Sequence, residues 1–116
     1  MKAVFKEMSV FSKYREQYLS DDQFRALQIF LLDSPEAGDV IRGTGGLRKL
    51  RWNDPQRGKG KRGGLRVIYY WYLIDHEFWL FTLYNKDEMS DLSTEERSLL
   101  RGLLEDELKQ RRGKRR

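Results

Sequence analysis

Nine Lys or Arg residues and a single acid, Asp54, lie between Arg42 and Arg66, in a stretch that is also rich in glycine. The net charge of this stretch, +8, exceeds the +5 of the whole 116-residue chain. Five further cations lie in residues 111–116, so the rest of the chain is acidic as a set. Cations concentrated beside structured elements are what a polyphosphate partner requires, and RNA is the first candidate.

The cationic stretch consists of a loop followed by the start of a strand. The cations that precede the strand are Arg57, Lys59, Lys61 and Arg62. Arg66 lies inside the apolar run 65–74, where a sheet would hold its guanidinium for bidentate contact with a phosphate. Because side chains alternate along a strand, Ile68, Tyr70 and Tyr72 would lie on the same face of the sheet as Arg66. Aromatic rings beside a guanidinium suit RNA base stacking, although the same composition also suits a solvated loop without a ligand.

Spacing and composition exclude several other chemistries. Residues 58–63 match the pattern G-x-G-x-x-G, but a strand follows them, whereas a dinucleotide site needs a helix there. No glycine begins a Walker A sequence. The chain has no cysteine and one histidine, His76, so we expect no metal site and no cofactor.

Length and composition predict one domain. A chain of 116 residues with 39% hydrophobic residues supports one modest core, and we expect 111–116 to form a flexible basic tail. The first residues lack an apolar signal stretch, and no window approaches the ~20 apolar residues of a membrane span. We therefore expect a soluble, cytoplasmic protein with no membrane partner.

Periodicity and turn signals predict the element order β, α, α, β, β, β, α. Ser20 with Gln23, and Ser93 with Glu96, have the spacing of capping boxes that begin helices. Helices segregated from an antiparallel hairpin predict the α+β class. The expected strands cover 2–6, 47–52, 65–74 and 78–84, the helices 9–19, 20–33 and 93 onward, and the connectors 38–46 and 53–64.

The hairpin formed by 65–74 and 78–84 places one further cation. Lys86 ends the second strand, and the end of one hairpin strand lies near the start of the other. We therefore expect Lys86 to approach Arg66 and the glycine-rich loop, although a lone strand-end lysine also serves solubility. His76 lies in the turn at the opposite end, so it is a poor candidate for chemistry at the loop.

Three blocks of sequence, Gly38–Arg51, Gly58–Tyr70 and Leu80–Leu92, together carry a family resemblance. They resemble the RelE-like toxins of bacterial type II toxin–antitoxin systems, most closely the HigB type with a RelE fold. The resemblance spans nearly the whole chain. It implies a RelE-like microbial RNase toxin fold, in which an antiparallel sheet packs against an N-terminal helical pair and a C-terminal helix.

The resemblance also implies an activity and a set of partners. Such toxins are ribosome-dependent endoribonucleases (mRNA interferases) that cut mRNA in the A site of the 30S subunit and stop translation. The expected partners are the ribosome with its rRNA, the mRNA substrate, and a cognate antitoxin that neutralises the toxin. Operator DNA is expected as a partner only through the antitoxin complex.

Matched position by position, Lys59 and Lys61 correspond to the family's loop lysines. Arg66 matches its strand arginine, and Lys86 matches the basic residue that ends its last strand. The implied chemistry is attack of the ribose 2′-OH on the adjacent phosphate, leaving a cyclic phosphate and a 5′-OH. Lys59 or Lys61 would be the base, because neighbouring cations lower the pKa of a lysine. Arg66 would stabilise the phosphorane, and Lys86 would assist the leaving group.

A second set of residues is expected to contact the RNA or the ribosome. These residues are Arg48, Lys49, Arg51, Arg57, Arg62 and Tyr70.

The chain departs from the family pattern in two respects, one of which is that it lacks the His and Asp set of another HigB branch, and other functions also fit it. Some RelE-like enzymes place a stacking tyrosine on the C-terminal helix, whereas no aromatic residue follows Tyr84 here. Within the loop, Arg62 competes with Lys61 for any role.

One alternative function is a non-enzymatic ParE-type toxin that binds DNA gyrase. Another is a basic RNA-binding domain without cleavage, which predicts steep salt dependence on naked RNA.

Overall fold

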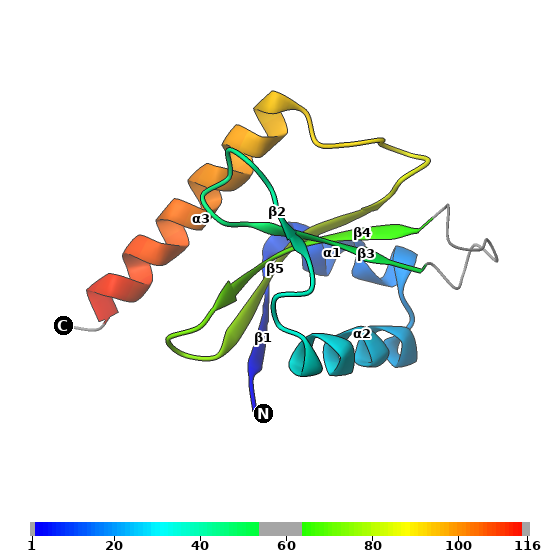
Figure 1. The fold of residues 1–116 in the computed structure, drawn as a ribbon, viewed down its shortest axis with the longest axis horizontal. Coiled ribbons are helices and arrows are strands. Elements are labelled where there is room, and N and C mark those ends of the chain that lie inside the picture. Colours follow the sequence, from blue (N-terminus) through cyan, green and yellow to red (C-terminus); the bar gives the residue numbers. More distant parts are fainter. Residues whose placement is uncertain (1, 54–63, 115–116) are drawn as a thin grey trace.

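The computed structural model describes residues 2–53 and 64–114, and it confirms the α+β class (Figure 1). The elements in chain order are β1 (Val4–Glu7), α1 (Ser9–Tyr18), α2 (Asp21–Asp33), β2 (Asp39–Val40), β3 (Arg48–Trp52), β4 (Leu65–Tyr72), β5 (Glu77–Asn85) and α3 (Thr94–Lys114). The strand β2 lies in the segment predicted as a connector, and that prediction is wrong for its two residues. Most of the predicted loop 53–64 lies outside the described residues.

The five strands form one sheet in the order β1-β5-β4-β3-β2. Strands β2 to β5 pair antiparallel with their neighbours, but β1 pairs parallel with β5. The predicted antiparallel sheet is therefore wrong at this edge. The reason is topological, because α1 and α2 follow β1 directly and β1 joins the sheet through a strand from much later in the chain.

Both predicted capping boxes are confirmed. The Ser20 hydroxyl accepts from the Gln23 backbone amide at 3.2 Å, and the Gln23 side-chain oxygen accepts from the Ser20 backbone amide at 2.8 Å. Ser93 and Glu96 make the same reciprocal pair at 3.1 and 2.7 Å. These contacts satisfy amide groups that a helix start leaves without partners, which explains where α2 and α3 begin.

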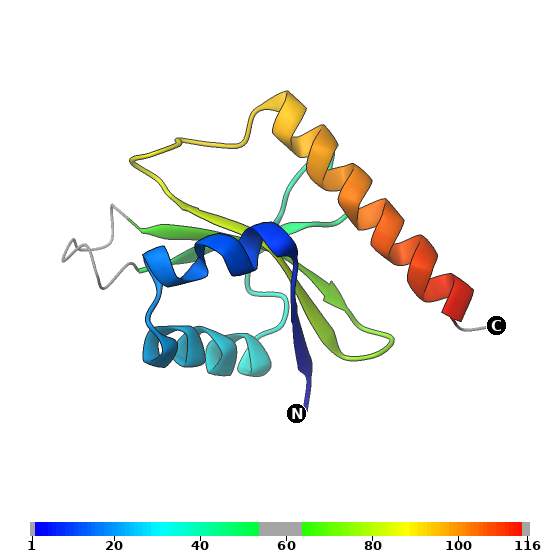
Figure 2. The same cartoon turned by 180° about the vertical axis from the view of Figure 1, so that it is seen from behind.

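The helices cover the two faces of the sheet separately. Figure 2 shows α1 and α2 on one face, and α3 crosses the other face (Figure 1). The core under α1 and α2 includes Phe11, Phe24, Leu27, Leu31, Leu50, Val67, Tyr69, Phe78 and Leu80. The core under α3, here called the α3 face, includes Ile41, Leu47, Ile68, Tyr72, Trp79, Phe81, Tyr84, Leu92, Leu100 and Leu104.

A β-bulge in β5 changes the pairing of the central hairpin. Tyr69 lies opposite Leu80, but the next pair toward the loop end is Ile68 with Thr82, so Phe81 is the extra residue. A bulge shifts every later pair by one position on one strand. It therefore places Tyr84, and not Leu83, opposite Arg66.

The C-terminal helix is anchored at the β4–β5 turn by Arg111. Its guanidinium contacts Asp75 at 3.0 Å and Glu77 at 2.7 Å, and it lies over the rings of Tyr72 and Trp79. Residues 111–114, predicted as part of a flexible tail, are therefore helical. Lys6 of β1 also pairs with Glu107 of α3. No helix among those described is long and apolar enough to cross a membrane.

Tyr69 joins the sheet to the segment after α2, which yields a stability prediction. Its buried hydroxyl donates to the Pro35 carbonyl at 2.8 Å and accepts from the Gly38 amide at 3.0 Å. Tyr69→Phe leaves that buried amide without its acceptor and should lower the free energy of unfolding by about 1–3 kcal/mol. Chemical denaturation measures the change. Tyr14→Phe on the exposed surface of α1 is the control, and equal effects of the two substitutions would contradict the prediction.

Candidate nucleic-acid interface

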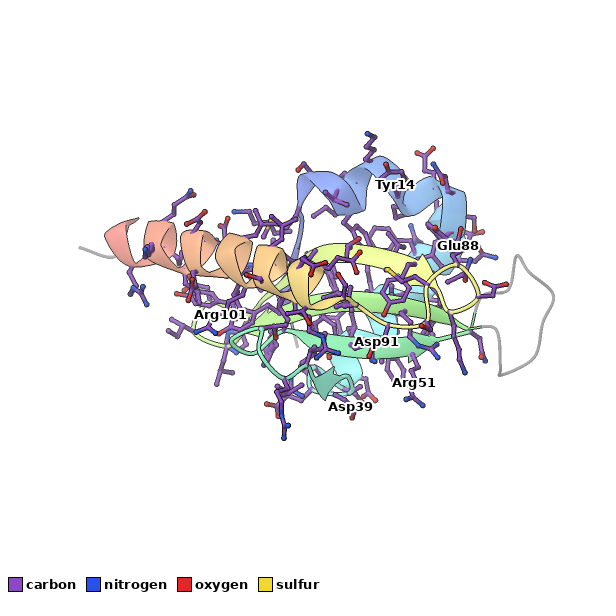
Figure 3. All side chains as sticks on the ribbon, turned by 90° about the horizontal axis from the view of Figure 1, so that it is seen from above. Tyr14, Asp39, Arg51, Glu88, Asp91 and Arg101 are labelled. Carbon is purple, nitrogen blue, oxygen red and sulfur yellow. The ribbon has the colours of Figure 1, made fainter. Side chains whose placement is uncertain are left out.

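Strand register brings a row of polar residues together on the α3 face. Arg51 of β3 lies directly opposite Arg66 of β4, which lies opposite Tyr84 of β5. Lys49, two residues before Arg51, is on the same face, opposite Ile68. Figure 3 labels Arg51 of β3 and Asp91 of the connection between β5 and α3. The loop-side end of this face is therefore cationic, whereas its other end is apolar and covered by α3.

Arg66 and Lys86 meet at the carbonyl of Gly64. The Arg66 guanidinium donates to this oxygen from Nη1 at 3.1 Å, and the Lys86 backbone amide donates to it at 3.3 Å. Arg66 is buried, with 8% of its surface exposed, and Lys86 is exposed. Lys86 thus approaches Arg66 and the end of the glycine-rich segment, where the hairpin argument puts it. Four other candidates, Arg57, Lys59, Lys61 and Arg62, lie outside the described residues.

Asp91 contributes a carboxylate beside the cationic row. It contacts Lys49 Nζ at 3.5 Å and Arg97 Nη2 at 3.1 Å, so it links β3, the β5–α3 connection and α3. The amide hydrogen bond from Leu92 lowers the pKa of Asp91, and the charges of Lys49 and Arg97 lower it further. Asp91 is therefore ionised at neutral pH and offsets part of the positive charge of its two partners.

Tyr84 lies within this charged neighbourhood but keeps its proton. Burial raises the pKa of the Tyr84 hydroxyl, the charge of Asp91 raises it further, and the charge of Arg66 opposes the rise. The side chain is 5% exposed, and its hydroxyl has no hydrogen-bond partner among the described residues. The hydroxyl is thus a neutral donor next to Arg66 at neutral pH.

The aromatic surface expected beside Arg66 is smaller than alternation suggested. Ile68 and Tyr72 belong to the α3-face core as expected, but they are buried at 0% and 5% exposure. They cannot stack on a base because α3 packs over them. Tyr70 is half-buried, with its ring 5.4 Å from that of Trp79, and it is the member of the predicted set that remains open to a ligand.

Arg48 does not join the cationic row. It lies opposite Tyr69, on the other face of the sheet, and donates to the carbonyl oxygens of Gly38 at 2.7 Å and Glu36 at 3.2 Å. It also pairs with the Glu36 carboxylate at 3.3 Å. These contacts join β3 to the segment after α2, so the structure gives Arg48 a local structural role.

His76 lies in the β4–β5 turn, at the opposite end of the hairpin from Arg66, with a positive φ of 54°. Its ring contacts Trp71 at a centroid distance of 5.9 Å. Within residues 2–53 and 64–114, no group of three or more His, Cys, Asp or Glu residues is placed to hold a metal ion.

Sequence reasoning missed three polar residues of the site, Tyr84, Asp91 and Arg97. Tyr84 was hidden because an unbulged hairpin would have put Leu83 opposite Arg66. Asp91 and Arg97 approach the row only because the β5–α3 connection crosses the α3 face. The sequence offered one signal here, the capping-box spacing of Ser93 and Glu96 just after Asp91. That signal predicted the start of the last helix, but it did not predict that Asp91 and Arg97 would lie beside the cationic row.

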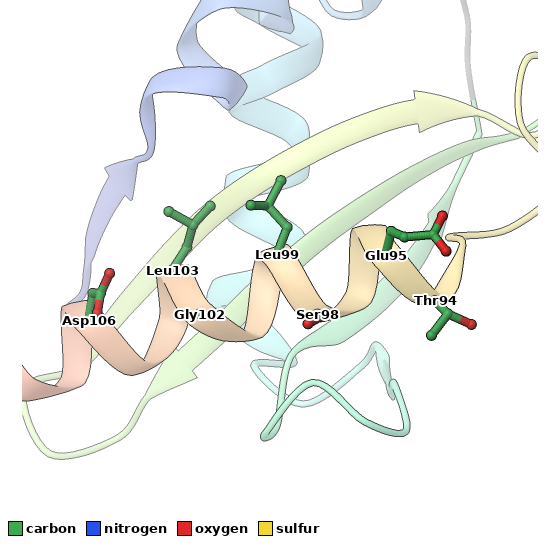
Figure 4. Close-up of a pocket in the computed structure, with 7 residues that line it drawn as sticks. All are labelled: Thr94, Glu95, Ser98, Leu99, Gly102, Leu103 and Asp106. Carbon is green, nitrogen blue, oxygen red and sulfur yellow. The ribbon is translucent and has the colours of Figure 1, made fainter.

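A second surface feature lies along α3 and differs in chemistry. A groove of about 440 Å³ lies between α3, β5 and the start of α1, and its charged lining residues are the acids Glu96, Asp106 and Glu107. Leu99 and Leu103 project from the same side of the helix, at 68% and 45% exposure (Figure 4). An apolar, acidic groove does not suit an RNA backbone, so the cationic row is the candidate interface.

Gly64 holds the local geometry of Arg66 and provides a prediction. A Cβ at this position would lie 3.0 Å from the Trp52 carbonyl oxygen and 3.3 Å from Arg66 Nη1. Gly64→Ala should therefore displace the guanidinium and lower the RNA cleavage that the family resemblance implies by about tenfold, because small misplacements at a reacting centre are costly. Gly102→Ala on α3, where a Cβ has open space, should leave cleavage unchanged and slightly stabilise the helix. Equal cleavage rates for the two variants would contradict this.

No family model matches the chain. Its fold is similar to that of the Escherichia coli toxin RelE, solved as a double mutant in the free state, with 14% identity, a TM-score of 0.52, and coverage of 78% of this chain and 90% of that chain. The intact E. coli RelBE toxin–antitoxin complex also matches, with 17% identity, a TM-score of 0.49, and coverage of 71% and 94%. The chain therefore has a RelE-like fold, as the sequence blocks predicted.

Proposed function

We propose that this protein is the toxin of a type II toxin–antitoxin system and acts as a ribosome-dependent endoribonuclease. The observation that carries the proposal is that the Arg66 guanidinium and the Lys86 backbone amide both donate to the Gly64 carbonyl, next in sequence to the segment that contains Lys59 and Lys61. A RelE-like fold with cations at this position supports the same conclusion.

The proposed reaction is attack of an mRNA 2′-OH on the adjacent phosphate. Lys59 or Lys61 removes the proton from the 2′-OH, and Arg66 stabilises the charge that develops on the phosphorane. Lys86 assists departure of the 5′ oxygen. Lys49 and Arg51 hold the flanking backbone by charge, and Tyr70 offers a ring for stacking.

The ribosome has a defined part in this proposal. The described residues of the interface supply cations, the tyrosines Tyr70 and Tyr84, and one carboxylate that is already paired. Such a set stabilises charge but gives little help in orienting a flexible RNA strand. Placement of the mRNA in the ribosomal A site supplies that orientation, and proximity of this kind accelerates reactions strongly. The protein then acts in the cytoplasm, and a cognate antitoxin restrains it.

A cell-free assay separates this proposal from gyrase inhibition. Purified protein added to a translation extract should stop incorporation of labelled amino acids, and supercoiling of relaxed plasmid by DNA gyrase should continue at its normal rate. The Arg66→Ala variant should leave translation running. Loss of supercoiling with normal translation would overturn the proposal.

A further inference from the structure

Two buried hydrogen-bond donors lie near Asp91 without acceptors in the described part of the chain. They are the hydroxyl of Tyr84 and the Nε of Arg97. A buried polar atom that makes no hydrogen bond is unfavourable, and folded proteins keep few of them. Two such donors beside one carboxylate therefore require an explanation.

Asp91 shows what kind of group these donors suit. Its carboxylate contacts Lys49 at 3.5 Å and Arg97 at 3.1 Å. Its charge also acts on Tyr84, together with those of Arg66, Glu96 and Arg97. Glu96 is occupied in capping α3, since it accepts from the Ser93 amide at 2.7 Å. Asp91 thus brings an anionic group to a set of donors but leaves two of them unbonded.

A phosphate suits this set of donors better than one carboxylate does. A carboxylate offers two oxygens in one plane, whereas the two charged oxygens and two ester oxygens of a backbone phosphate are arranged tetrahedrally, and inorganic phosphate offers four free oxygens. Lys49 and Arg97 supply positive charge, and the Tyr84 hydroxyl, which stays protonated, supplies a neutral donor. Charge-assisted hydrogen bonds of this kind are the strong ones, and guanidinium groups favour phosphate.

We propose that Lys49, Tyr84 and Arg97 form a second phosphate site beside Arg66, which Asp91 occupies in the unliganded protein and which an RNA backbone phosphate takes over. Tyr84 lies opposite Arg66 in the strand register, so this site adjoins the proposed reaction centre. The assignment to RNA rests on the proposed function, whereas binding of a phosphate does not. Tyr84 and Arg97 then hold the phosphate next to the scissile one. Asp91 lowers the affinity of the site for phosphate, because the phosphate must displace its carboxylate.

NMR of the full chain labelled with ¹⁵N tests the site directly. The Nε–H signal of Arg97, assigned through its loss in Arg97→Lys, should shift as inorganic phosphate replaces chloride at constant ionic strength. The Arg101 Nε–H, which contacts Glu105 at 3.4 Å on the same helix, is the matched control and should not move. Asp91→Asn should tighten phosphate binding about three- to tenfold, and Tyr84→Phe should weaken it by a similar factor.

Thermal stability and the KM of Tyr84→Phe distinguish a role of Tyr84 in binding from a purely structural role. Tyr84→Phe removes an unbonded hydroxyl, so its thermal stability should equal or exceed that of the wild type, whereas its KM for ribosome-bound mRNA should rise. An Arg97 signal that ignores phosphate, or phosphate affinities unchanged in both variants, would overturn the site even if the protein cleaves mRNA.

A short single-stranded oligoribonucleotide separates the sources of phosphate. If the site belongs to the RNA path, the oligonucleotide should shift the Arg97 signal at a lower concentration than inorganic phosphate does. A response to inorganic phosphate alone would make it a free-anion site and overturn the RNA assignment. Absence of mRNA cleavage by the wild type, with the oligonucleotide still binding at Arg97, would count against the proposed function and leave the site standing.

Discussion

Arg66→Ala should lower the rate of mRNA cleavage on ribosomes by about 10²–10³-fold, the usual loss when a preorganised charge stabiliser is removed. Arg66 is held by β4 and by the Gly64 carbonyl, so its guanidinium is oriented before the substrate arrives. Arg66→Lys keeps the charge but loses the planar, two-pronged donor, and it should recover only part of the rate. Single-turnover cleavage of a defined mRNA measures both variants.

Arg25→Ala is the control for the Arg66 variants. Arg25 is exposed on α2, which covers the opposite face of the sheet, so its removal changes the net charge equally without touching the interface. Its cleavage rate should stay within about twofold of the wild type, because exposed charges act weakly at long range. If Arg25→Ala and Arg66→Ala lose cleavage equally, net charge and not position explains the activity.

Arg111→Ala should lower the free energy of unfolding by about 2–3 kcal/mol, because it removes the ion pair of the mostly buried Glu77 carboxylate, to which Trp79 Nε1 still donates, and removes a cation from two aromatic faces. Arg112→Ala is the matched control, since Arg112 is the exposed neighbour in the same helical turn. Guanidinium chloride denaturation at pH 7 compares the two variants. Arg112→Ala should change the free energy of unfolding little.

The pH dependence of the Arg111 effect has a defined sign. The hydrogen bond from Arg111 lowers the pKa of Glu77 in the folded protein. A carboxyl whose folded pKa is lowered stabilises the fold above its unfolded pKa of about 4.3 and loses that contribution as pH falls through the folded value. The difference between wild type and Arg111→Ala should therefore be largest near neutral pH and smaller at pH 3. A difference that stays constant with pH would show that Arg111 acts through packing alone.

Local signals predicted most of the helices and strands. The capping boxes at Ser20 and Ser93 mark helix starts because they satisfy amides within four residues of themselves, and the structure keeps both. The two long aromatic runs form β4 and β5, as predicted, because β-branched and aromatic residues favour strands in the middle of a sheet. Signals of this range do not extend to partners distant in the chain.

Several of the differences involve such distant partners. Parallel pairing of β1 with β5 depends on residues more than 70 positions apart. Residues 111–114 continue α3, and Arg111 there contacts Asp75 in the β4–β5 turn and Glu77 at the start of β5, both far upstream in the chain. In the site, the bulge at Phe81 decides that Tyr84 faces Arg66, and a one-residue shift of that kind leaves no clear mark in the composition of either strand. The proximity of Lys86 to Arg66 could be predicted because it depends only on hairpin geometry, which places the end of β5 beside the start of β4.

Primer extension on a defined mRNA, with purified protein and with or without translating ribosomes, tests the central claim most directly. We expect cuts at A-site codons in the presence of ribosomes, no cuts on naked mRNA, and none with Arg66→Ala in either tube. Cuts of equal strength without ribosomes, or none in any tube with folded wild-type protein, would contradict it.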